Sequence, residues 1–275
     1  MPKPNAVAVV GDLHAGSTVG LMPPSFKTVS GQILVYSDEQ KWLWERWLEL
    51  CAWYGEYELD ALILNGDLPN GINARDAENL GANESDQINL VVAALKPLLY
   101  VGHKRRVQNV YVTRGTGYHA GAASWREEQI AKWIGAVCDK NGAYSRYVND
   151  LTWRGRRLVF THHINTASVY PLTPLQRAQR DWRVRCQAKG TRMPDVDIRG
   201  HVHTSYAYES NDNKWIGTLP SWQLLTQHAH RVVPMAEQDL VTGGGLIWLD
   251  ENGKVILERR LYRLPETQGM EIPTT

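Results

Sequence analysis

The sequence has few cysteines, almost no phenylalanine and no excess of charge of one sign. Its 275 residues include 3 cysteines, Cys51, Cys138 and Cys186, whose spacing matches neither a zinc knuckle nor a redox motif. Such sparse cysteine is typical of a reducing compartment. With 30 basic against 29 acidic residues the formal net charge is +1, so any basic surface must be local.

Long hydrophobic runs are missing as well. No segment approaches the roughly 18 consecutive apolar residues of a membrane span, and the start, MPKPNAVAVVGDLH, leaves no room for a signal peptide. We therefore expect a soluble, cytoplasmic protein without membrane contact. Tryptophan is abundant, with 11 residues against 2 phenylalanines, and most of these side chains are expected in the core.

Short apolar runs alternate with helical patterns through most of the chain. The runs stop abruptly at polar residues, as buried strands do, at 6–10, 59–64, 107–113, 157–160 and 196–198. Helices are predicted at 38–53, 84–100, 124–137 and 173–189. Ser37 suits the N-cap of the first helix, with Gln40 completing a capping box.

The last third of the chain is rich in strand patterns. They are predicted at 204–210, 213–219, 244–249 and 253–263, with a hairpin turn at Asp250-Glu251-Asn252-Gly253. The whole order predicts an α/β protein, a single domain over residues 1–275 with a β-rich C-terminal part. Because ligands bind at the carboxyl ends of strands in such sheets, motifs far apart in sequence should meet at one edge.

Two aspartate motifs follow the first two predicted strands. Asp12 and His14 stand two residues apart in Gly11-Asp12-Leu13-His14, and Asp67 follows in Gly66-Asp67. In an extended segment, residues two apart point the same way and could grip one ion, while a carboxylate can bridge two ions through its two oxygens. Each motif alone is a weak signal, because aspartate after a strand is usually a turn residue.

Two histidine pairs follow later strands. In Gly200-His201-Val202-His203, the two histidines would project to one side of an extended segment, so that each could take one of two adjacent ions. In Thr161-His162-His163, neighbouring side chains face opposite sides and only one can reach a shared site. We favour His162 as the ligand, which leaves His163 as a candidate for substrate contact.

Together these motifs offer carboxylates and imidazoles without sulfur. Such a set suits Mn, Fe, Zn or similar ions and disfavours a structural cysteine zinc site. Two ions about 3.5–4 Å apart would polarise a phosphate and activate a bridging water.

The order D-x-H, G-D, a glycine-centred motif, H and G-H-x-H resembles the calcineurin-like metallophosphoesterase superfamily, over roughly residues 5 to 210. The resemblance implies two mixed β-sheets packed as a sandwich and flanked by helices, in four αββα layers. It also implies two divalent metal ions, with Mn favoured over Fe, Zn, Ni or Co. Asp12, His14 and His203 would hold one ion, His162 and His201 would hold the second, and Asp67 would bridge them.

The third motif departs from the family pattern of G-N-H followed by Asp or Glu. Here the chain reads Arg114-Gly115-Thr116-Gly117-Tyr118-His119, with Thr116 at the position of the asparagine ligand. His119, two residues late, could ligate the second ion or act as the general acid. Arg114 could bind a phosphate oxygen, and Asn70 could orient Asp67 or contact substrate.

The functional prediction is a dinuclear metal-dependent phosphodiesterase that uses metal-activated hydroxide. Residues 66–72 read GDLPNGI and lack the phosphoprotein-phosphatase signature G-D-x-V-D-R-G, which argues against a protein phosphatase. A phosphomonoesterase acting on a nucleotide or small metabolite is the enzymatic alternative. A binding module with a degraded metal site is the alternative of another class.

A basic run between residues 177 and 192 and a second H-x-H motif complete the candidates. The run could hold nucleic-acid phosphates, or it could be an ordinary solvated helix face. Gln227-His228-Ala229-His230 lacks a preceding strand and a glycine, and we predict a surface or pocket-rim segment there. Nothing in the sequence indicates an oligomeric state. The run comprises Arg177, Arg180, Arg183, Arg185, Lys189 and Arg192, with Trp182 among them.

Overall fold

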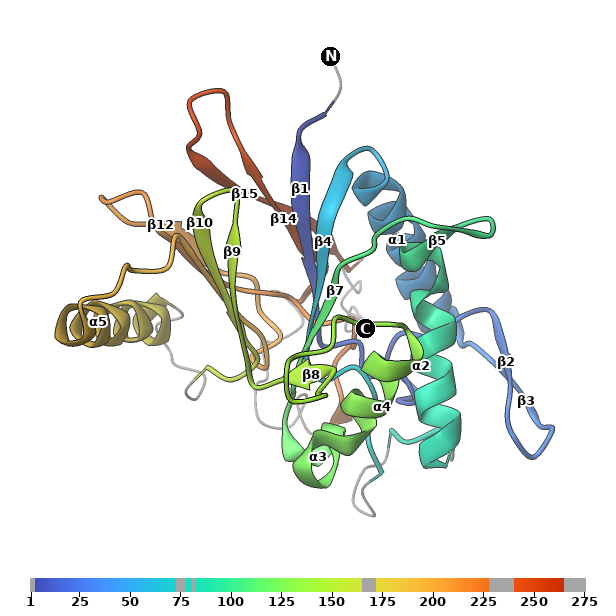
Figure 1. Ribbon diagram of the computed structural model, residues 1–275. Coiled ribbons are helices and arrows are strands. Elements are labelled where there is room, and N and C mark those ends of the chain that lie inside the picture. Colours follow the sequence, from blue (N-terminus) through green and yellow to red (C-terminus); the bar gives the residue numbers. More distant parts are fainter. Residues whose placement is uncertain (1–2, 73–77, 81–82, 165–171, 228–239, 265–275) are drawn as a thin grey trace, which may run out of the picture.

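Two mixed β-sheets pack face to face in the computed structural model, which describes residues 3–72, 78–80, 83–164, 172–227 and 240–264. Helices α1, α2 and α4 cover one outer face, and α5 covers the other (Figure 1). The predicted four-layer αββα arrangement is therefore confirmed.

The first sheet has six strands in the order β15-β14-β1-β4-β7-β8. Strands β1, β4, β7 and β8 run parallel, whereas β14 lies antiparallel to both β1 and β15. Their bounds are Asn5–Val10 (β1), Glu58–Asn65 (β4), Val110–Thr113 (β7), Ser145–Arg146 (β8), Val241–Leu249 (β14) and Val255–Arg263 (β15).

The second sheet has five strands in the order β12-β13-β11-β10-β9. Its central strands β10, β11 and β13 are parallel, and the edge strands β9 and β12 are antiparallel to their neighbours. Their bounds are Val148–Trp153 (β9), Arg156–Thr161 (β10), Val196–Arg199 (β11), Ala207–Glu209 (β12) and Trp215–Thr218 (β13).

Strand β1 shows why its apolar run has no polar interruption. Ala6, Ala8 and Val10 pack toward the helices, while Val7 and Val9 pack toward the second sheet. Side chains alternate across a strand, so a strand covered on both faces must be apolar at every position. This central strand leads directly to Asp12.

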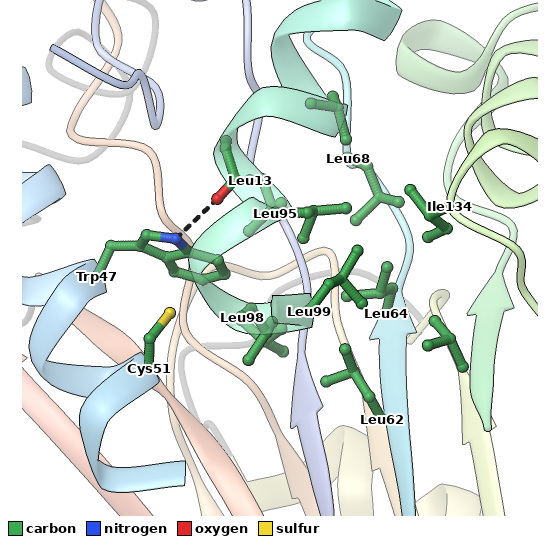
Figure 2. Close-up of a cluster of buried hydrophobic side chains, with 14 of the residues drawn as sticks. Leu13, Trp47, Cys51, Leu62, Leu64, Leu68, Leu95, Leu98, Leu99 and Ile134 are labelled. Carbon is green, nitrogen blue, oxygen red and sulfur yellow. Dashed lines mark hydrogen bonds between the residues drawn. The ribbon is translucent and has the colours of Figure 1, made fainter. Parts of the chain in front are cut away.

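The helical layer consists of α1 (Asp38–Tyr54), α2 (Glu84–Leu99) and α4 (Trp125–Trp133). The capping box of Ser37 and Gln40 is present at the start of α1. Fully buried Trp47 lies beside Leu95 and Leu98 (Figure 2), and its Nε1 donates to the Ala94 carbonyl at 2.9 Å. The indole thus joins α1 to α2 through packing and a hydrogen bond.

Helix α5 (Leu172–Lys189) forms the fourth layer on the second sheet. Its buried Leu175 packs with Ile164 and Ile216, supported by Ala178 and Val202. No helix in the described part of the chain has the length and apolar character needed to cross a bilayer.

Several small elements differ from the sequence expectation. Strand β9 was not predicted because apolar Val148 is exposed and polar Asn149 is buried, so its sequence VNDLTW shows neither an apolar run nor a regular apolar–polar alternation. The helix predicted to end at 137 ends at Trp133, where Gly135 turns left-handed at φ 65°. The other short elements are β2 (Ser25–Lys27), β3 (Ile33–Val35), β5 (Tyr100–Val101), β6 (Lys104–Arg105), α3 (Gly117–Ala120) and the 3₁₀ turn η1 (Ala122–Ser124).

Candidate metal centre

The candidate ligands lie where strands of both sheets end. Asp12 and His14 follow β1, Asp67 follows β4, and His162 follows β10. His201 and His203 follow β11, and the Nε2 atoms of His14 and His203 come within 3.0 Å although 189 residues separate them in sequence. The expected convergence at one edge therefore occurs, and it uses both layers of the sandwich.

The backbone at these residues is left-handed and not extended. The φ angles are 52° at Asp12, 44° at His14 and 49° at Asp67, and they are 73° at His201 and 57° at His203. The expectation that residues two apart converge because they lie on extended chain is therefore wrong here. Positive φ costs a non-glycine residue of the order of 1–3 kcal/mol, and such strain concentrates at functional sites.

Asp12, His14 and His203 form the first ligand set, here called the His14 group. The Asp12 Oδ1 atom lies 3.5 Å from His203 Nε2 and 3.9 Å from His14 Nε2. Asp12 and His14 are fully buried, whereas the His203 side chain is one-third exposed. Three donor atoms thus face a common point at the rim of the sandwich.

Asp67, His162 and His201 form the second set, the His162 group. His162 Nε2 lies 2.9 Å from Asp67 Oδ2, and its Nδ1 is 2.8 Å from the Asn65 carbonyl, which fixes the ring. His201 is exposed, and its backbone N–H donates to Asp12 Oδ1 at 3.1 Å. This hydrogen bond connects the two groups.

His119 joins His14 and Asp67 in a third set of potential ligands. Its ring lies 4.5 Å from the His14 ring, centroid to centroid, and its Nδ1 contacts the Asn70 carbonyl. Within each of the three sets, all ligand atoms lie within 4.8 Å of one another. Since Asp67 belongs to two sets, its carboxylate is placed to serve two ions.

The donor atoms fit divalent metal ions. Among the described residues, His162 Nε2 is a buried nitrogen without a hydrogen-bond partner that pairs electrostatically with Asp67, and His14 Nε2 faces His203 and Asp12. Buried polar nitrogens are seldom left without partners, and imidazole with carboxylate is a ligand set that Mn, Fe and Zn accept.

The two groups differ in charge. Burial, reinforced by the neighbouring His119 and His203, holds the pKa of His14 well below its ordinary value, and desolvation by the surrounding protein lowers the pKa of the partly exposed His203 to about 4. Burial also opposes a charge on His162, but Asp67 and Asp12 outweigh it and raise its pKa to about 10. Burial raises the pKa of Asp12 to about 7. The His14 group is thus built from neutral rings, and the His162 group from an ion pair.

Comparisons with known proteins find similar structures but no similar sequences. No family model and no curated protein matches the sequence. A dimetal phosphatase from Danio rerio is 10% identical, with a TM-score of 0.49 and coverage of 94% of this chain and 96% of that one. Vps29 from Chaetomium thermophilum is 14% identical, with a TM-score of 0.43 and coverage of 96% and 97%.

A predicted phosphoesterase from Streptococcus pneumoniae is 9% identical, with a TM-score of 0.36 and coverage of 94% and 99%. At such low identities and scores, these likenesses by themselves decide nothing about the site. The layers, the strand order and the placement of ligands after β1, β4, β10 and β11 are this chain's own.

The two sheets and the helices on their outer faces form a four-layer αββα sandwich.

Within this four-layer sandwich, Thr116 holds the shared carboxylate. Its backbone N–H donates to Asp67 Oδ1 at 2.7 Å, and its hydroxyl donates to the same oxygen at 3.1 Å. Thr116 therefore orients Asp67 in this structure, and direct ligation of an ion by its oxygen stays a prediction. Asn70 is buried and orients His119 through its carbonyl, which places it behind the ligands.

The structure does not bring Arg114 to the ligand cluster. Its Nε donates to Ser145 Oγ at 3.0 Å, its Nη2 lies 3.4 Å from Glu128, and its guanidinium lies 5.0 Å from the centre of the Tyr147 ring. These contacts turn the side chain toward β8 and α4, so a role in binding phosphate would require it to leave them. Sequence position alone could not reveal these partners, because Glu128 and Ser145 lie 14 and 31 residues further along the chain.

His163 lies beside the cluster. It is exposed, and its ring centroid is 5.4 Å from that of His201, whereas buried His162 lies in the His162 group. An exposed ring at this distance remains available for substrate. His228 and His230 of the second H-x-H motif lie outside the described residues.

The sequence patterns did not indicate a role for Glu127 in the site. It is fully buried, its Oε2 accepts the Gly115 N–H at 2.6 Å, and its Oε1 accepts the Leu68 N–H at 3.4 Å. Glu127 thereby joins the loop of Asp67 to the loop of Thr116. Burial, reinforced by the Asp67 charge, raises its pKa to about 8. In sequence it looks like an ordinary acidic residue of a first helical turn, so only the fold could reveal it.

Proposed function

We propose that this protein is a dinuclear metal-dependent phosphodiesterase. The observation that carries the proposal is the clustering of three potential ligand sets, two of which share Asp67, at one edge of the fold. When bound, two divalent ions would supply positive charge for the phosphate and an activated water for hydrolysis. The ligands are imidazoles and carboxylates, which suit Mn, Fe, Zn, Ni or Co, and Mn is the ion that we favour.

The chain's own groups prepare the ligands in advance. The carbonyls of Asn65 and Asn70 fix the rings of His162 and His119, and Thr116 holds the Asp67 carboxylate. Partners of this kind set ring orientation and ligand basicity, and their loss typically weakens metal binding or activity about 10–100-fold.

A diester is favoured over a monoester because three arginines that follow or adjoin the ligand motifs are already paired. Arg114 contacts Glu128, Arg126 contacts Glu84, and Arg199 contacts Asp197. A monoester dianion carries one more negative charge than a diester and gains more from an additional free cation. These three arginines are not free to neutralise that additional charge, which supports the substrate of lower charge.

Activity measurements test this choice. We expect the Mn-loaded protein to hydrolyse bis(p-nitrophenyl) phosphate with a higher kcat/KM than p-nitrophenyl phosphate. A strong monoester preference would favour the phosphomonoesterase alternative. Near-zero bound metal, with no hydrolysis in Mn, Fe, Zn, Ni or Co, would favour the non-catalytic binding module.

The two roles open to His119 can be separated by the leaving group. A general acid matters most when the leaving group is a poor one. A dinucleotide has a poor leaving group, the alkoxide of a nucleoside. If His119 is the acid, His119→Ala therefore reduces kcat far more for a dinucleotide than for the nitrophenyl diester. If His119 is a ligand, both rates fall together and the bound metal decreases. Asn70 contacts Nδ1, so Nε2 is the nitrogen left for either role.

We also propose a cytoplasmic location. Cys51, Cys138 and Cys186 are free thiols, and Cys138 is exposed. An exposed free thiol is typical of proteins kept in a reducing compartment.

A further inference from the structure

The two outer helical layers carry opposite charge. Helix α1 has four acidic and two basic residues, whereas α5 has five basic residues and a single acidic one, Asp181. The net charge of +1 conceals this difference because the two layers compensate each other. One outer face of the sandwich, the one covered by α5, therefore carries a local basic surface (Figure 1).

Most cations of α5 are exposed and make no ion pair in the described part of the chain. This holds for Arg177, Arg180, Arg185 and Lys189. Arg183 differs, because its guanidinium lies 3.7 Å from Asp212 across a surface pocket of about 540 Å³. Other cations on this side of the molecule, in β10 and in loops of the second sheet, are paired with aspartates: Arg157, Arg192 and Lys214. Four positive charges on this helix thus remain uncompensated.

The same helix is fastened to the metal centre. Leu175 and Ala178 pack with Ile164, two residues after His162, and with Val202, which lies between His201 and His203. Arg177 follows this anchor directly, and Lys189 lies twelve residues further on. At about 1.5 Å per residue, the cations extend over roughly 18 Å from the ligand loops outward.

We propose that α5 is the docking surface for the phosphate backbone of a single-stranded nucleic acid, which is the substrate that the metal centre cleaves. The inference rests on the proposed phosphodiesterase function. A span of roughly 18 Å matches several phosphates, at about 3.4 Å per phosphate along one DNA strand. Free cations distributed along a helix that is anchored beside a hydrolytic centre suit a polymer of phosphodiesters, whereas a small diester would reach only the nearest of them.

Trp182 contributes to the support of this surface. Its Nε1 donates to Asp197 at 2.8 Å, and the Arg157 guanidinium lies 5.1 Å from the centre of its ring. The indole is therefore occupied inside the layer, and α5 offers no free aromatic ring there for stacking on bases. Binding through α5 is accordingly expected to be electrostatic and independent of base sequence.

The test is a charge reversal on the full-length protein, Arg177→Glu combined with Arg180→Glu. The affinity for a fluorescein-labelled oligothymidylate is measured by fluorescence anisotropy between about 50 and 200 mM salt. We expect a loss of affinity of about tenfold or more at low salt. The slope of log affinity against log salt should fall by roughly 1.4, about 0.7 for each lost phosphate contact on a single strand.

The matched control is Lys27→Glu combined with Lys41→Glu, the same charge change at exposed residues of the opposite side. It should bind the oligonucleotide as the wild type does. Hydrolysis of bis(p-nitrophenyl) phosphate should be unchanged in both variants, because this substrate is too short to need α5. If the glutamate variant does not fold, Arg177→Gln with Arg180→Gln replaces it, with half the change in charge.

The outcomes separate the two proposals. Unchanged oligonucleotide affinity and salt slope in the α5 variant would overturn the docking surface while leaving diester hydrolysis intact. Equal losses in the α5 variant and the control would also overturn it, since net charge alone would then explain the binding. Absence of diester hydrolysis in the wild type would instead overturn the proposed function. Binding to anionic phospholipid vesicles without binding to the oligonucleotide would reassign the face to a membrane.

Discussion

The His14 group and the His162 group are built from the same residue types, but the pKa values of their buried histidines are shifted in opposite directions. In the His162 group, a ring whose pKa is raised to about 10 faces the Asp67 carboxylate at 2.9 Å. In the His14 group, two rings whose pKa values are depressed face each other with Nε2 atoms 3.0 Å apart. The first arrangement supplies its own positive charge, and the second supplies none.

The difference indicates how each group takes up an ion. A metal ligand must be deprotonated, so the His162 group has to release a proton before binding. The rings of the His14 group are neutral at ordinary pH and are ready to bind. We therefore expect the His14 group to fill first as metal is added at neutral pH, and the His162 group to fill more readily as pH rises.

The largest expected effect comes from Asp67, the residue that both halves of the centre share. Asp67→Ala should reduce kcat/KM on bis(p-nitrophenyl) phosphate by about a thousandfold or more, because both ions lose a ligand. Asp60→Ala, at a partly exposed aspartate in β4, is the control and should retain activity. An Asp67→Ala variant with full activity would contradict the two-metal site.

Removing one histidine from each group tests whether the halves act separately. His203→Ala and His162→Ala should each lower activity on the order of a hundredfold and reduce the bound metal from two ions toward one. Calorimetry in buffers of different ionisation enthalpy counts the protons released on loading. The wild type and His203→Ala should release the His162 proton, and His162→Ala should not. Equal release in all three proteins would show that the groups do not differ as described.

Glu127 tests whether the loops beside Asp67 and Thr116 need a common anchor. Glu127→Gln keeps one acceptor oxygen but sets an amide N–H against a backbone N–H, so activity and metal affinity should fall roughly tenfold. Glu128→Gln is the neighbouring control, since Glu128 accepts from the Ser145 hydroxyl and the Tyr144 N–H at the start of β8. Similar metal affinities for the two variants would remove Glu127 from the centre's support.

The smallest effect is on the pH dependence of stability after metal removal. The pKa of His162 is raised to about 10, so its stabilisation is complete below its ordinary value near 6.5 and is lost as pH rises through 10. The pKa of His203 is lowered to about 4, so its contribution is present above about 6.5 and is lost as pH falls toward 4.

Melting temperatures in a chelator should therefore drop by several degrees at both ends of the pH range. His162→Asn should flatten the alkaline side, and His203→Asn the acid side. If each variant instead altered both sides equally, the charge difference between the two groups would be refuted.

Local patterns made much of the fold predictable. The apolar run of β1, the Ser37 and Gln40 capping box and the order of the ligand motifs all depend on neighbours in sequence. The edge strand β9 was missed because it carries no such local signal. In the site, the prediction that strand ends would converge was right, while the extended backbone that it assumed was not.

The sequence by itself determined which side chains follow which strands, because strand endings and residue types are local properties. Only the tertiary structure decided what each side chain touches: His14 meets His203 across the sandwich, Thr116 holds Asp67, and Arg114 turns away to Glu128. It also placed Glu127 beneath two loops and separated a neutral ligand group from a charged one. The physical reason is that burial and pairing of charge arise between segments that only packing brings together.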